Sequence, residues 1–201
     1  LVVAPIWLRK KFLKLIGRET KHAKEGKEGK IVAKMNSLCD KEIIAALYEA
    51  SAAGVKIDLI IRGICCLRTG IPGISEQIRV RSIVGNFLEH SRIFYFYNNG
   101  QPEFYMGSAD WMPRNLDRRV EILFPVEDEE IQKSVYHILE VELMDNVKAH
   151  ILGQDGEYEK IDKRGKVLVN SQDQFCKEAK VKKAKDKGKY KERVFIPVEP
   201  V

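Results

Sequence analysis

Two cationic side chains stand near the start of residues 87–96, a stretch that alternates like a buried strand. His90 and Arg92 are two positions apart, so the pleat of a strand would place both side chains on one face. Two adjacent cations repel each other, and an anionic ligand shared between them would offset that cost. The simpler interpretation is a hydrogen-bonded histidine with Glu89 as the neutralising partner. The sequence leaves both interpretations open.

A third cation, Arg62, ends the apolar run VKIDLII, and Gly63 follows it directly. In open α/β sheets, ligands bind beyond the carboxyl ends of parallel strands. A guanidinium at such a position can hold two phosphate oxygens at once, and a glycine lets the ligand approach the backbone closely. The alternative is a structural ion pair between Arg62 and Asp58 or Glu89. Position alone does not decide between the two.

Charged and amide side chains are concentrated in GSADWMPRNLDRRVEI, residues 107–122. They are Asp110, Arg114, Asn115, Asp117, Arg118 and Arg119. A surface loop held by ion pairs would have this composition, and each exposed pair contributes about 0 to 1 kcal/mol. The alternative is a polar wall beside the strand that carries His90.

The elements that must position these residues begin with an alternation of helix and strand. The spacing of apolar residues predicts a helix over 7–26, a strand over 30–36, a helix over 40–54 and a strand over 55–61. Asp40 suits the N-cap of the second helix, and Gly54 suits its end. Because a helix joins the two strands, residues 30–61 should form a βαβ unit with parallel strands and a right-handed crossover.

Four more strands should follow a loop rich in Gly and Pro. They are expected over 78–85, 90–98, 103–110 and 118–126. The step Asn98-Asn99-Gly100 is a hairpin signal between two of them. An amphipathic helix with an acidic start should cover 128–145, and 146–161 should form a small hairpin or an extended arm. The chain is therefore expected to be an α/β domain with a mixed sheet.

The positive charge of the chain is concentrated at its end. The formal net charge is +6, and residues 177–201 contribute nine Lys or Arg against four Asp or Glu, which leaves +1 for residues 1–176. This balance does not favour a nucleic-acid-binding core. The Lys-rich segment 177–201 contains few apolar residues, and we expect it to be disordered or loosely attached.

Other global features exclude several classes of protein. No apolar run approaches the roughly 18 to 20 residues that span a bilayer, and the start does not have the charge order of a signal peptide. The absence of an initiating Met favours a piece of a longer chain. Cys39, Cys65, Cys66 and Cys176 match no common zinc spacing, so we expect reduced thiols, with Cys65 and Cys66 as packing residues.

The order of these features resembles the catalytic half of the phospholipase D superfamily, which carries His-x-Lys and an Asp, then Gly-Ser and an Asn. Here Arg92 replaces the Lys, Tyr97 stands in place of the Asp, and Asp110 stands in place of the Asn. These departures resemble another branch, the C-terminal domain of polyphosphate kinase, from about residue 3 to residue 176. The likeness is carried by RGICCLRTGIPG and SADWMPRNLDRRVE. Trp7 departs from that family, in which a smaller or polar residue is expected.

The resemblance implies a phospholipase D-like mixed sheet flanked by helices, in one domain over 1–176. It implies reversible transfer of the terminal phosphate of ATP to inorganic polyphosphate through a phosphohistidine in a preceding domain. Arg62 matches the arginine that holds the nucleotide phosphates. His90 matches the second histidine, which contacts the phosphates and acts as general acid at the leaving group. Four further arginines are expected to guide the polyanion: Arg79, Arg81, Arg114 and Arg118.

The resemblance also implies ligands and partners. ATP, ADP and polyphosphate are the expected substrates, Mg²⁺ is expected with its ligands outside this chain, and no metal is expected on this chain itself. Preceding domains and a homo-oligomeric full enzyme are expected partners, without nucleic acid or a transmembrane segment. A cytoplasmic location is expected, with peripheral membrane association left open. The chain alone is expected not to turn over ATP.

Two other functions remain open. One is a phospholipase D-type phosphodiesterase or nuclease built from two chains across a shared cleft, although Arg92 and Tyr97 break its motif. The other is a non-catalytic assembly module, in which His90 and Arg62 would be buried and paired with acidic side chains.

Overall fold

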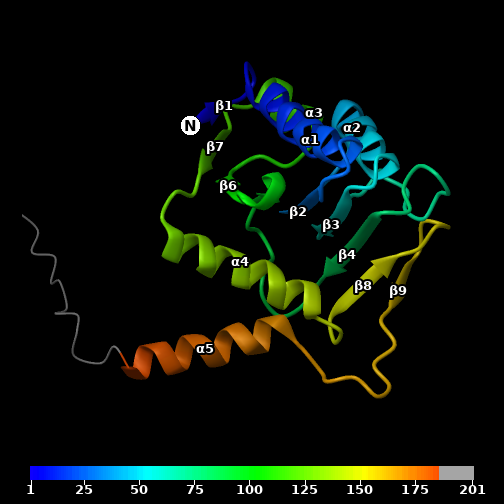
Figure 1. Cartoon of the computed structure of the whole chain (residues 1–201). Coiled ribbons are helices and arrows are strands. Elements are labelled where there is room, and N and C mark those ends of the chain that lie inside the picture. Colours follow the sequence, from blue (N-terminus) through cyan, green and yellow to red (C-terminus); the bar gives the residue numbers. More distant parts are fainter. Residues whose placement is uncertain (186–201) are drawn as a thin grey trace, which may run out of the picture.

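A mixed β-sheet forms the centre of the computed structural model, which describes residues 1–185 (Figure 1). Within that range, nine strands follow the order β1-β7-β6-β5-β2-β3-β4-β8-β9. Their bounds are β1 (Val2–Val3), β2 (Lys30–Met35), β3 (Lys56–Ile61), β4 (Ile78–Ile83), β5 (Ile93–Phe96), β6 (Glu103–Gly107), β7 (Ile122–Pro125), β8 (Ala149–Leu152) and β9 (Tyr158–Lys160). The helices are α1 (Leu8–Lys24), α2 (Lys41–Ala52), α3 (Pro113–Arg118), α4 (Glu129–Met144) and α5 (Ser171–Lys185), with a 3₁₀ turn at Asn98–Gly100.

The three central strands β2, β3 and β4 run parallel, and the remaining pairs are antiparallel. The predicted unit over 30–61 is confirmed, because α2 connects β2 to its parallel neighbour β3. The predicted hairpin at Asn98–Gly100 is also confirmed, because β5 and β6 pair in antiparallel register on either side of it. The parallel strands end at one edge of the sheet, where crossover folds place their ligands.

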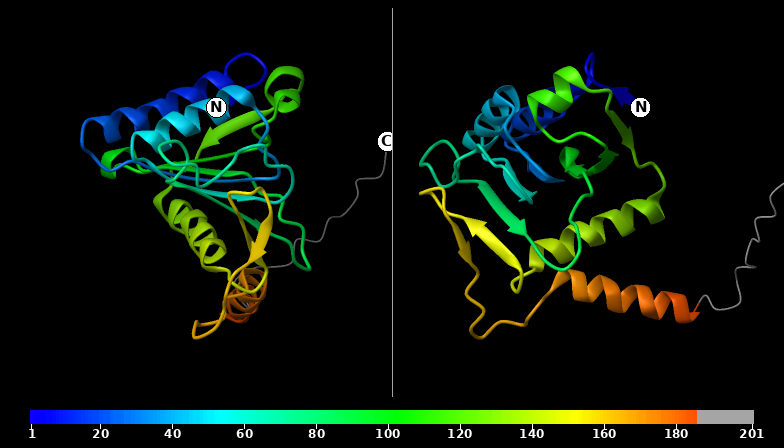
Figure 2. Two further views of the ribbon diagram at one scale, coloured as in Figure 1. Left: turned by 90° about the vertical axis from the view of Figure 1, so that its right-hand side faces the viewer. Right: turned by 180° about the vertical axis from the view of Figure 1, so that it is seen from behind.

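Helices cover both faces of the sheet, with α1 and α2 on one side and α4 on the other (Figure 2). The side chains of β5 alternate between the two faces of the sheet. Phe94 and Phe96 belong to the core under α1 and α2, and Ile93 and Tyr95 belong to the core under α4. Phe94 packs 5.3 Å from Trp111, measured between ring centroids. The sequence pattern of residues 93–96 is therefore explained by burial on both faces.

Two helices begin at acidic caps. The Asp40 side chain accepts a hydrogen bond from Ile43 N at the start of α2, which confirms its predicted role. The Asp128 side chain accepts from two backbone N–H groups in the first turn of α4. Gly54 takes a positive φ of 99° just beyond α2, a conformation that glycine adopts without strain.

Several boundaries differ from the predictions. β5 begins at Ile93, so His90 and Arg92 lie in the loop before the strand and not on its pleat. The start of the predicted strand 118–126 is taken up by the end of α3 and an extended turn, and β7 begins at Ile122. The 146–161 segment is a hairpin, in which β8 also pairs with β4.

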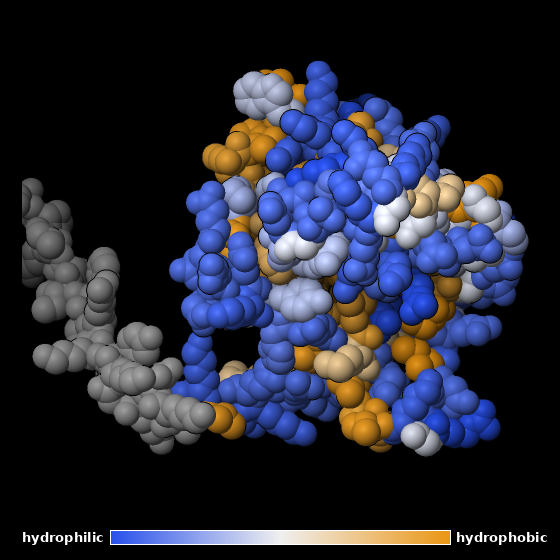
Figure 3. Space-filling model, in the orientation of Figure 1, coloured by the Kyte–Doolittle hydropathy of each residue, from blue (hydrophilic) through white to orange (hydrophobic). Residues whose placement is uncertain are grey.

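The first part of the Lys-rich end is helical. Residues 177–185 belong to α5, whose Lys, Ala and Glu residues have high helix propensity and whose first turn is tied to the domain. The rest of the predicted flexible segment, 186–201, lies outside the described residues. None of the described helices is long and apolar enough to cross a membrane. Figure 3 shows a mainly hydrophilic face, with an apolar patch over β1 and β7.

Candidate functional site

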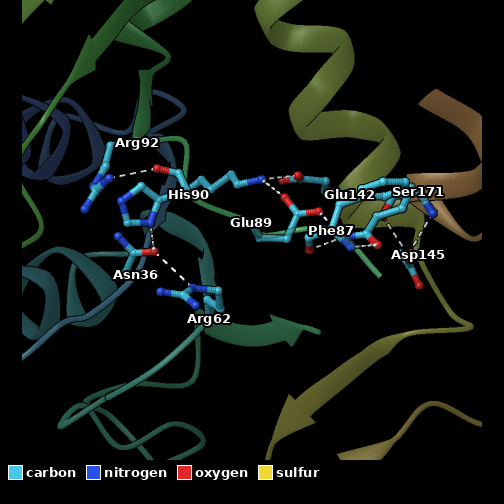
Figure 4. Close-up of polar contacts among 11 residues, drawn as sticks. Asn36, Arg62, Phe87, Glu89, His90, Arg92, Glu142, Asp145 and Ser171 are labelled. Atoms are coloured by element: carbon cyan, nitrogen blue, oxygen red, sulfur yellow. Dashed lines mark hydrogen bonds and ion pairs between the residues drawn. The ribbon is translucent and has the colours of Figure 1, made fainter. Parts of the chain in front are cut away.

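The site begins where β2 and β3 end side by side. Met35 and Ile61 are register partners, so the next residues, Asn36 and Arg62, emerge together at the edge of the sheet. Arg62 Nε donates a hydrogen bond of 3.1 Å to Asn36 Oδ1 (Figure 4). Asn36 is buried and Arg62 is half-buried. The strand ends thus hold the guanidinium against a fixed amide.

His90 reaches the same amide oxygen from the loop between β4 and β5. Its Nδ1 lies 3.1 Å from Asn36 Oδ1. An amide oxygen only accepts hydrogen bonds, so His90 Nδ1 must carry the proton and Nε2 faces away from Asn36. His90 is exposed, and its Nε2 is therefore presented to a ligand in solution. The predicted meeting of Arg62 and His90, which are 28 residues apart in the sequence, is what the structure shows.

The orientation of the Asn36 amide is fixed by Asp110. Asn36 Nδ2 lies 3.2 and 3.3 Å from the two carboxylate oxygens of Asp110, and Asn36 N donates to Asp110 Oδ1 at 2.8 Å. A carboxylate accepts hydrogen bonds, so it faces the NH₂ group and leaves Oδ1 for Arg62 and His90. Asp110 is buried at the position where the segment after β6 approaches the end of β2.

Arg92 supports the site without facing a shared ligand. Its Nε and Nη2 donate to Asp110 at 3.2 and 3.3 Å, and Nη1 donates to the backbone oxygen of His90 at 2.8 Å. The expectation that an anion lies between His90 and Arg92 on one strand face is therefore wrong. Asp110 neutralises Arg92, and Arg92 in turn fixes the backbone of His90.

The structural ion pairs that we considered for Arg62 and His90 are absent from the described part of the chain. Neither Asp58 nor Glu89 forms a salt bridge with Arg62 there, and its two terminal nitrogens make no hydrogen bond within residues 1–185. Glu89 instead lies 2.5 Å from Lys34 Nζ. Arg62 and His90 therefore still have nitrogens that can donate hydrogen bonds to an anion. If the two residues were only structural, their side chains would instead be paired with acidic residues of the protein.

A buried network behind the site was missed by sequence reasoning. Lys34 is 2% exposed and contacts both Glu89 and Glu142. Burial raises the pKa of Glu142 to about 7, against the opposing effect of Lys34. Burial alone would also raise the pKa of Glu89, but hydrogen bonds from Gln172 and Lys34 outweigh it and lower that pKa. A lysine inside an apolar strand was the signal that an acidic partner must lie opposite.

The two arginines of β4 do not reach this edge. Arg79 is the register partner of Asp58 near the start of β3. Asp58 lies four residues before Arg62, which is about 13 Å along the strand at about 3.3 Å per residue. Arg81 is half-buried and donates through Nη1 to the backbone oxygens of Glu142 and Leu143 at the end of α4. Desolvation lowers the pKa of Arg81. Arg81 thus stabilises the end of α4 through Nη1. Its role as a contact for polyphosphate stays a prediction.

The other two predicted arginines lie on α3. Arg114 and Arg118 are exposed and line an open depression together with Pro113, Asp117 and Arg119. Asp117 is bound by Arg9 of α1, so the predicted ion pair in this segment exists but involves a distant partner. The role of Arg114 and Arg118 as contacts for a polyanion stays a prediction.

No group of three His, Cys, Asp or Glu side chains within residues 1–185 is arranged to hold a metal. Asp110, the carboxylate that orients Asn36, is already bound by Asn36 and Arg92. The cysteines differ in their surroundings: Cys65 is partly buried, whereas Cys66 is exposed and does not have the packing role that we expected. Burial raises the pKa of Cys65 to about 11, which disfavours its thiolate and agrees with a packing role.

Comparison with known proteins identifies the domain. Residues 1–172 match the family model described as polyphosphate kinase C-terminal domain 2. A polyphosphate kinase from Thermosynechococcus vestitus is 60% identical over 158 residues, which cover 79% of this chain and 22% of that protein. Polyphosphate kinase 1 from Chlorobaculum tepidum is 53% identical over 183 residues, covering 91% of this chain and 26% of that protein. This chain therefore spans about a quarter of the length of these relatives.

Solved structures agree with the sequence comparison. The crystal structure of polyphosphate kinase from Porphyromonas gingivalis superimposes with a TM-score of 0.87 and 41% identity, covering 92% of this chain and 28% of that one. Nuc from Salmonella typhimurium, a phospholipase D family member, superimposes with a TM-score of 0.52 at 16% identity, covering 79% of this chain and 95% of its own. The second likeness shows the phospholipase D-like fold alone. The chain belongs to the polyphosphate kinase family, and its described part is the C-terminal, phospholipase D-like domain of such a protein.

Proposed function

We propose that this domain supplies the phosphate-binding half of a site that transfers the terminal phosphate of ATP to polyphosphate and back. The observation that carries the proposal is the meeting of Arg62 Nε and His90 Nδ1 at one oxygen of Asn36. Both groups lie beyond the carboxyl ends of parallel strands, and neither is paired with a carboxylate in the described chain. A triphosphate would meet two donors there whose positions are set in advance.

Arg62 and His90 have different roles in the proposed phosphoryl transfer. Arg62 directs its two free terminal nitrogens at phosphate oxygens, where a guanidinium can form two parallel hydrogen bonds. His90 holds its Nδ1 proton on Asn36, so Nε2 is the atom that faces the phosphates. In its protonated form Nε2 donates to the oxygen that bridges the β- and γ-phosphates. Phosphoryl transfer depends mainly on such positioning and charge stabilisation.

The bond changes follow from this arrangement. A histidine nitrogen in a preceding domain attacks the γ-phosphorus of ATP, an N–P bond forms, and the bridging P–O bond breaks. The electron pair of that bond stays on the β-phosphate of ADP, whose new charge is stabilised by Arg62 and by the proton of His90 Nε2. A terminal oxygen of polyphosphate then attacks the same phosphorus and the N–P bond breaks. The expected Mg²⁺ is not assigned to residues of this chain.

The proposal predicts a loss of activity when either donor is removed from the full-length enzyme that contains this chain. Arg62→Ala and His90→Ala should each lower kcat/KM for ATP by about 100-fold or more, as for other groups that stabilise developing charge. Arg164→Ala is the matched control, because it removes an exposed arginine that bonds only to Asp162 within the described residues, and it should leave the rate within about twofold of wild type. Initial rates of polyphosphate synthesis from ATP provide the measurement, and wild-type rates for both site variants would refute the proposal.

The phosphodiesterase alternative is less well supported by the site. In that chemistry a second cation beside the histidine must face the substrate, whereas Arg92 is bound to Asp110 and to the His90 backbone. Incubation with a phosphodiester should therefore leave His90 unmodified, which mass spectrometry would show. A covalent phosphoryl adduct on His90 would favour the hydrolase instead.

A further inference from the structure

The loop that carries His90 has little backbone support of its own. Residues 84–91 form most of the connection between β4 and β5, and within the described chain none of them makes a backbone–backbone hydrogen bond. The first such bond comes at Arg92, whose backbone oxygen accepts from Gly107 N at 3.4 Å. Phe87 and Leu88 are exposed, so apolar burial does not fix this loop either. Something else must hold the backbone that presents the imidazole.

Gln172, in the first turn of α5, holds the backbone of this loop through its side-chain amide. Phe87 N donates to Gln172 Oε1 at 3.0 Å, and Gln172 Nε2 donates to Phe87 O at 2.8 Å. The amide thus pairs with one residue through both of its backbone groups, as a neighbouring strand would. Gln172 Nε2 also donates to Glu89 Oε1 at 2.7 Å, and Glu89 is bound on its other oxygen by Lys34. Gln172 as a whole residue is 5% exposed, so water competes little for these bonds.

The helix turn that carries Gln172 is itself anchored. Ser171 N and Ser171 Oγ donate to Asp145 Oδ2 at 2.8 and 2.7 Å. Asp145 ends α4, and its other oxygen accepts from the backbone of residues 147–149. Burial would raise the pKa of Asp145, but these hydrogen bonds lower it, so the carboxylate stays charged and keeps its partners. Figure 4 shows these contacts around Asp145, Ser171, Phe87 and Glu89, with His90 held separately by Asn36 and Arg92.

We propose that Gln172 is a positioning residue for His90: α5 holds the 84–91 loop through the Gln172 amide and thereby fixes where the imidazole meets the phosphates. The inference rests on the phosphate-handling role proposed above for His90. Its physical basis is that Phe87 and Glu89, both within three residues of His90, are the loop positions that Gln172 binds. From the opposite side, Asn36 and Arg92 hold the ring and the backbone oxygen of His90.

The test uses an isosteric change in the full-length enzyme. Gln172→Glu keeps the shape of the side chain but removes both donated bonds and places a second carboxylate beside Glu89. We expect kcat for polyphosphate synthesis to fall about 10-fold or more, with unchanged thermal unfolding taken as the check on folding. Gln174→Glu is the matched control: Gln174 lies in the same helix and bonds only to Glu178 of α5, so its rate should stay within about twofold of wild type.

A second variant reaches the same contact from the loop. A Cβ added at Gly85 would lie 2.3 Å from Gln172 Oε1, so Gly85→Ala should push the amide away from Phe87 without changing any charge. The same loss of kcat is expected. Because this variant leaves Gln172 in place, it keeps the inference testable if Gln172→Glu does not fold.

The decisive experiment combines Gln172→Glu with His90→Ala in one double variant. The residual turnover of radiolabelled ATP is measured for this variant and for each single variant. If Gln172 acts through His90, Gln172→Glu should lower the rate no further in the His90→Ala background. An equal loss in both backgrounds, or a Gln172→Glu rate equal to that of Gln174→Glu, would overturn the inference alone. A wild-type rate for His90→Ala would overturn the role proposed for His90, and this inference with it.

Discussion

At the scale of single residues, the site depends on one amide. Asn36 Oδ1 accepts from both Arg62 and His90, and its NH₂ group faces Asp110. An aspartate at this position would place two carboxylates in contact in a buried setting and would remove the donor to Asp110. Unpaired or repelling buried polar groups cost about 1 to 3 kcal/mol.

We therefore predict that Asn36→Asp lowers both stability and activity. The free energy of unfolding should fall by about 1 to 3 kcal/mol in urea titrations, and the rate of polyphosphate synthesis should fall as far as in the single Arg62 or His90 variants. Ser37→Ala, one residue further along, is the control, because no hydrogen bond of the Ser37 side chain holds the site in the described structure. Wild-type activity of Asn36→Asp would show that the shared oxygen is dispensable.

The buried Glu142 gives a prediction on pH. Its pKa is raised to about 7 by burial, so the folded state binds a proton more tightly than the unfolded chain does. The stabilising contribution is present at low pH and is lost as the pH rises toward and through 7. Glu142→Gln removes this titration, so the Tm of the wild type should fall relative to that of the variant between pH 5 and 8. A Tm difference between the two proteins that stays constant over this range would contradict a raised pKa of Glu142.

At the scale of elements, helix starts and strand ends place the site residues. The α2 helix begins at Asp40, whose carboxylate also binds Arg9 Nε and Nη2 at 3.1 and 2.8 Å. The α4 helix begins at the exposed Asp128, whose carboxylate accepts only from its own helix turn. The two caps are chemically alike but differ in burial and in their connection to α1.

This difference predicts unequal costs for the same substitution. Asp128→Ala should lower the free energy of unfolding by about 1 kcal/mol, the usual value for a lost N-cap. Asp40→Ala should cost about 2 kcal/mol or more, because it also leaves the Arg9 guanidinium without a buried partner. Urea unfolding of both variants tests the order, and an equal cost would mean that the Arg9 contact contributes nothing.

Much of this arrangement is visible in the sequence, and some of it is not. The parallel β2 and β3, the Asp40 cap and the position of Arg62 follow from local pattern, because apolar period and capping chemistry are properties of neighbouring residues. Asn36 was missed, although it follows β2 as Arg62 follows β3 and the register of parallel strands would have paired them. Gln172 gives no local signal at all, since its partner Phe87 is 85 residues away and meets it only when α5 docks.

The start of β5 is a failure of a different kind. The alternation over 93–96 was interpreted correctly, but it was extended back to His90, where no second layer demands burial. Arg92 is drawn out of the strand by Asp110, a contact that only the folded sheet supplies. An alternating apolar pattern thus predicts the buried part of a strand well but predicts the polar end of the strand poorly.

At the scale of the whole molecule, the domain supplies Arg62 and His90 to the proposed phosphate site but forms only one side of it. We predict that the 201-residue chain does not synthesise polyphosphate from ATP, whereas the full-length enzyme does. Calorimetric titration with ATP should still detect weak binding that Arg62→Ala abolishes. Catalytic synthesis by the chain alone would show that it carries its own phosphate-accepting group.

The groups of the proposed site and their supports come from four separate segments: the residue after β2, the residue after β3, the loop before β5 and the turn after β6. An extended chain scatters them, so a ligand that depends on all of them recognises only the native state. A polyanion that binds this site should then raise the Tm of the protein, and the rise should be larger for a tighter-binding polyanion. The Tm from a thermal unfolding curve would therefore report how far the site is occupied.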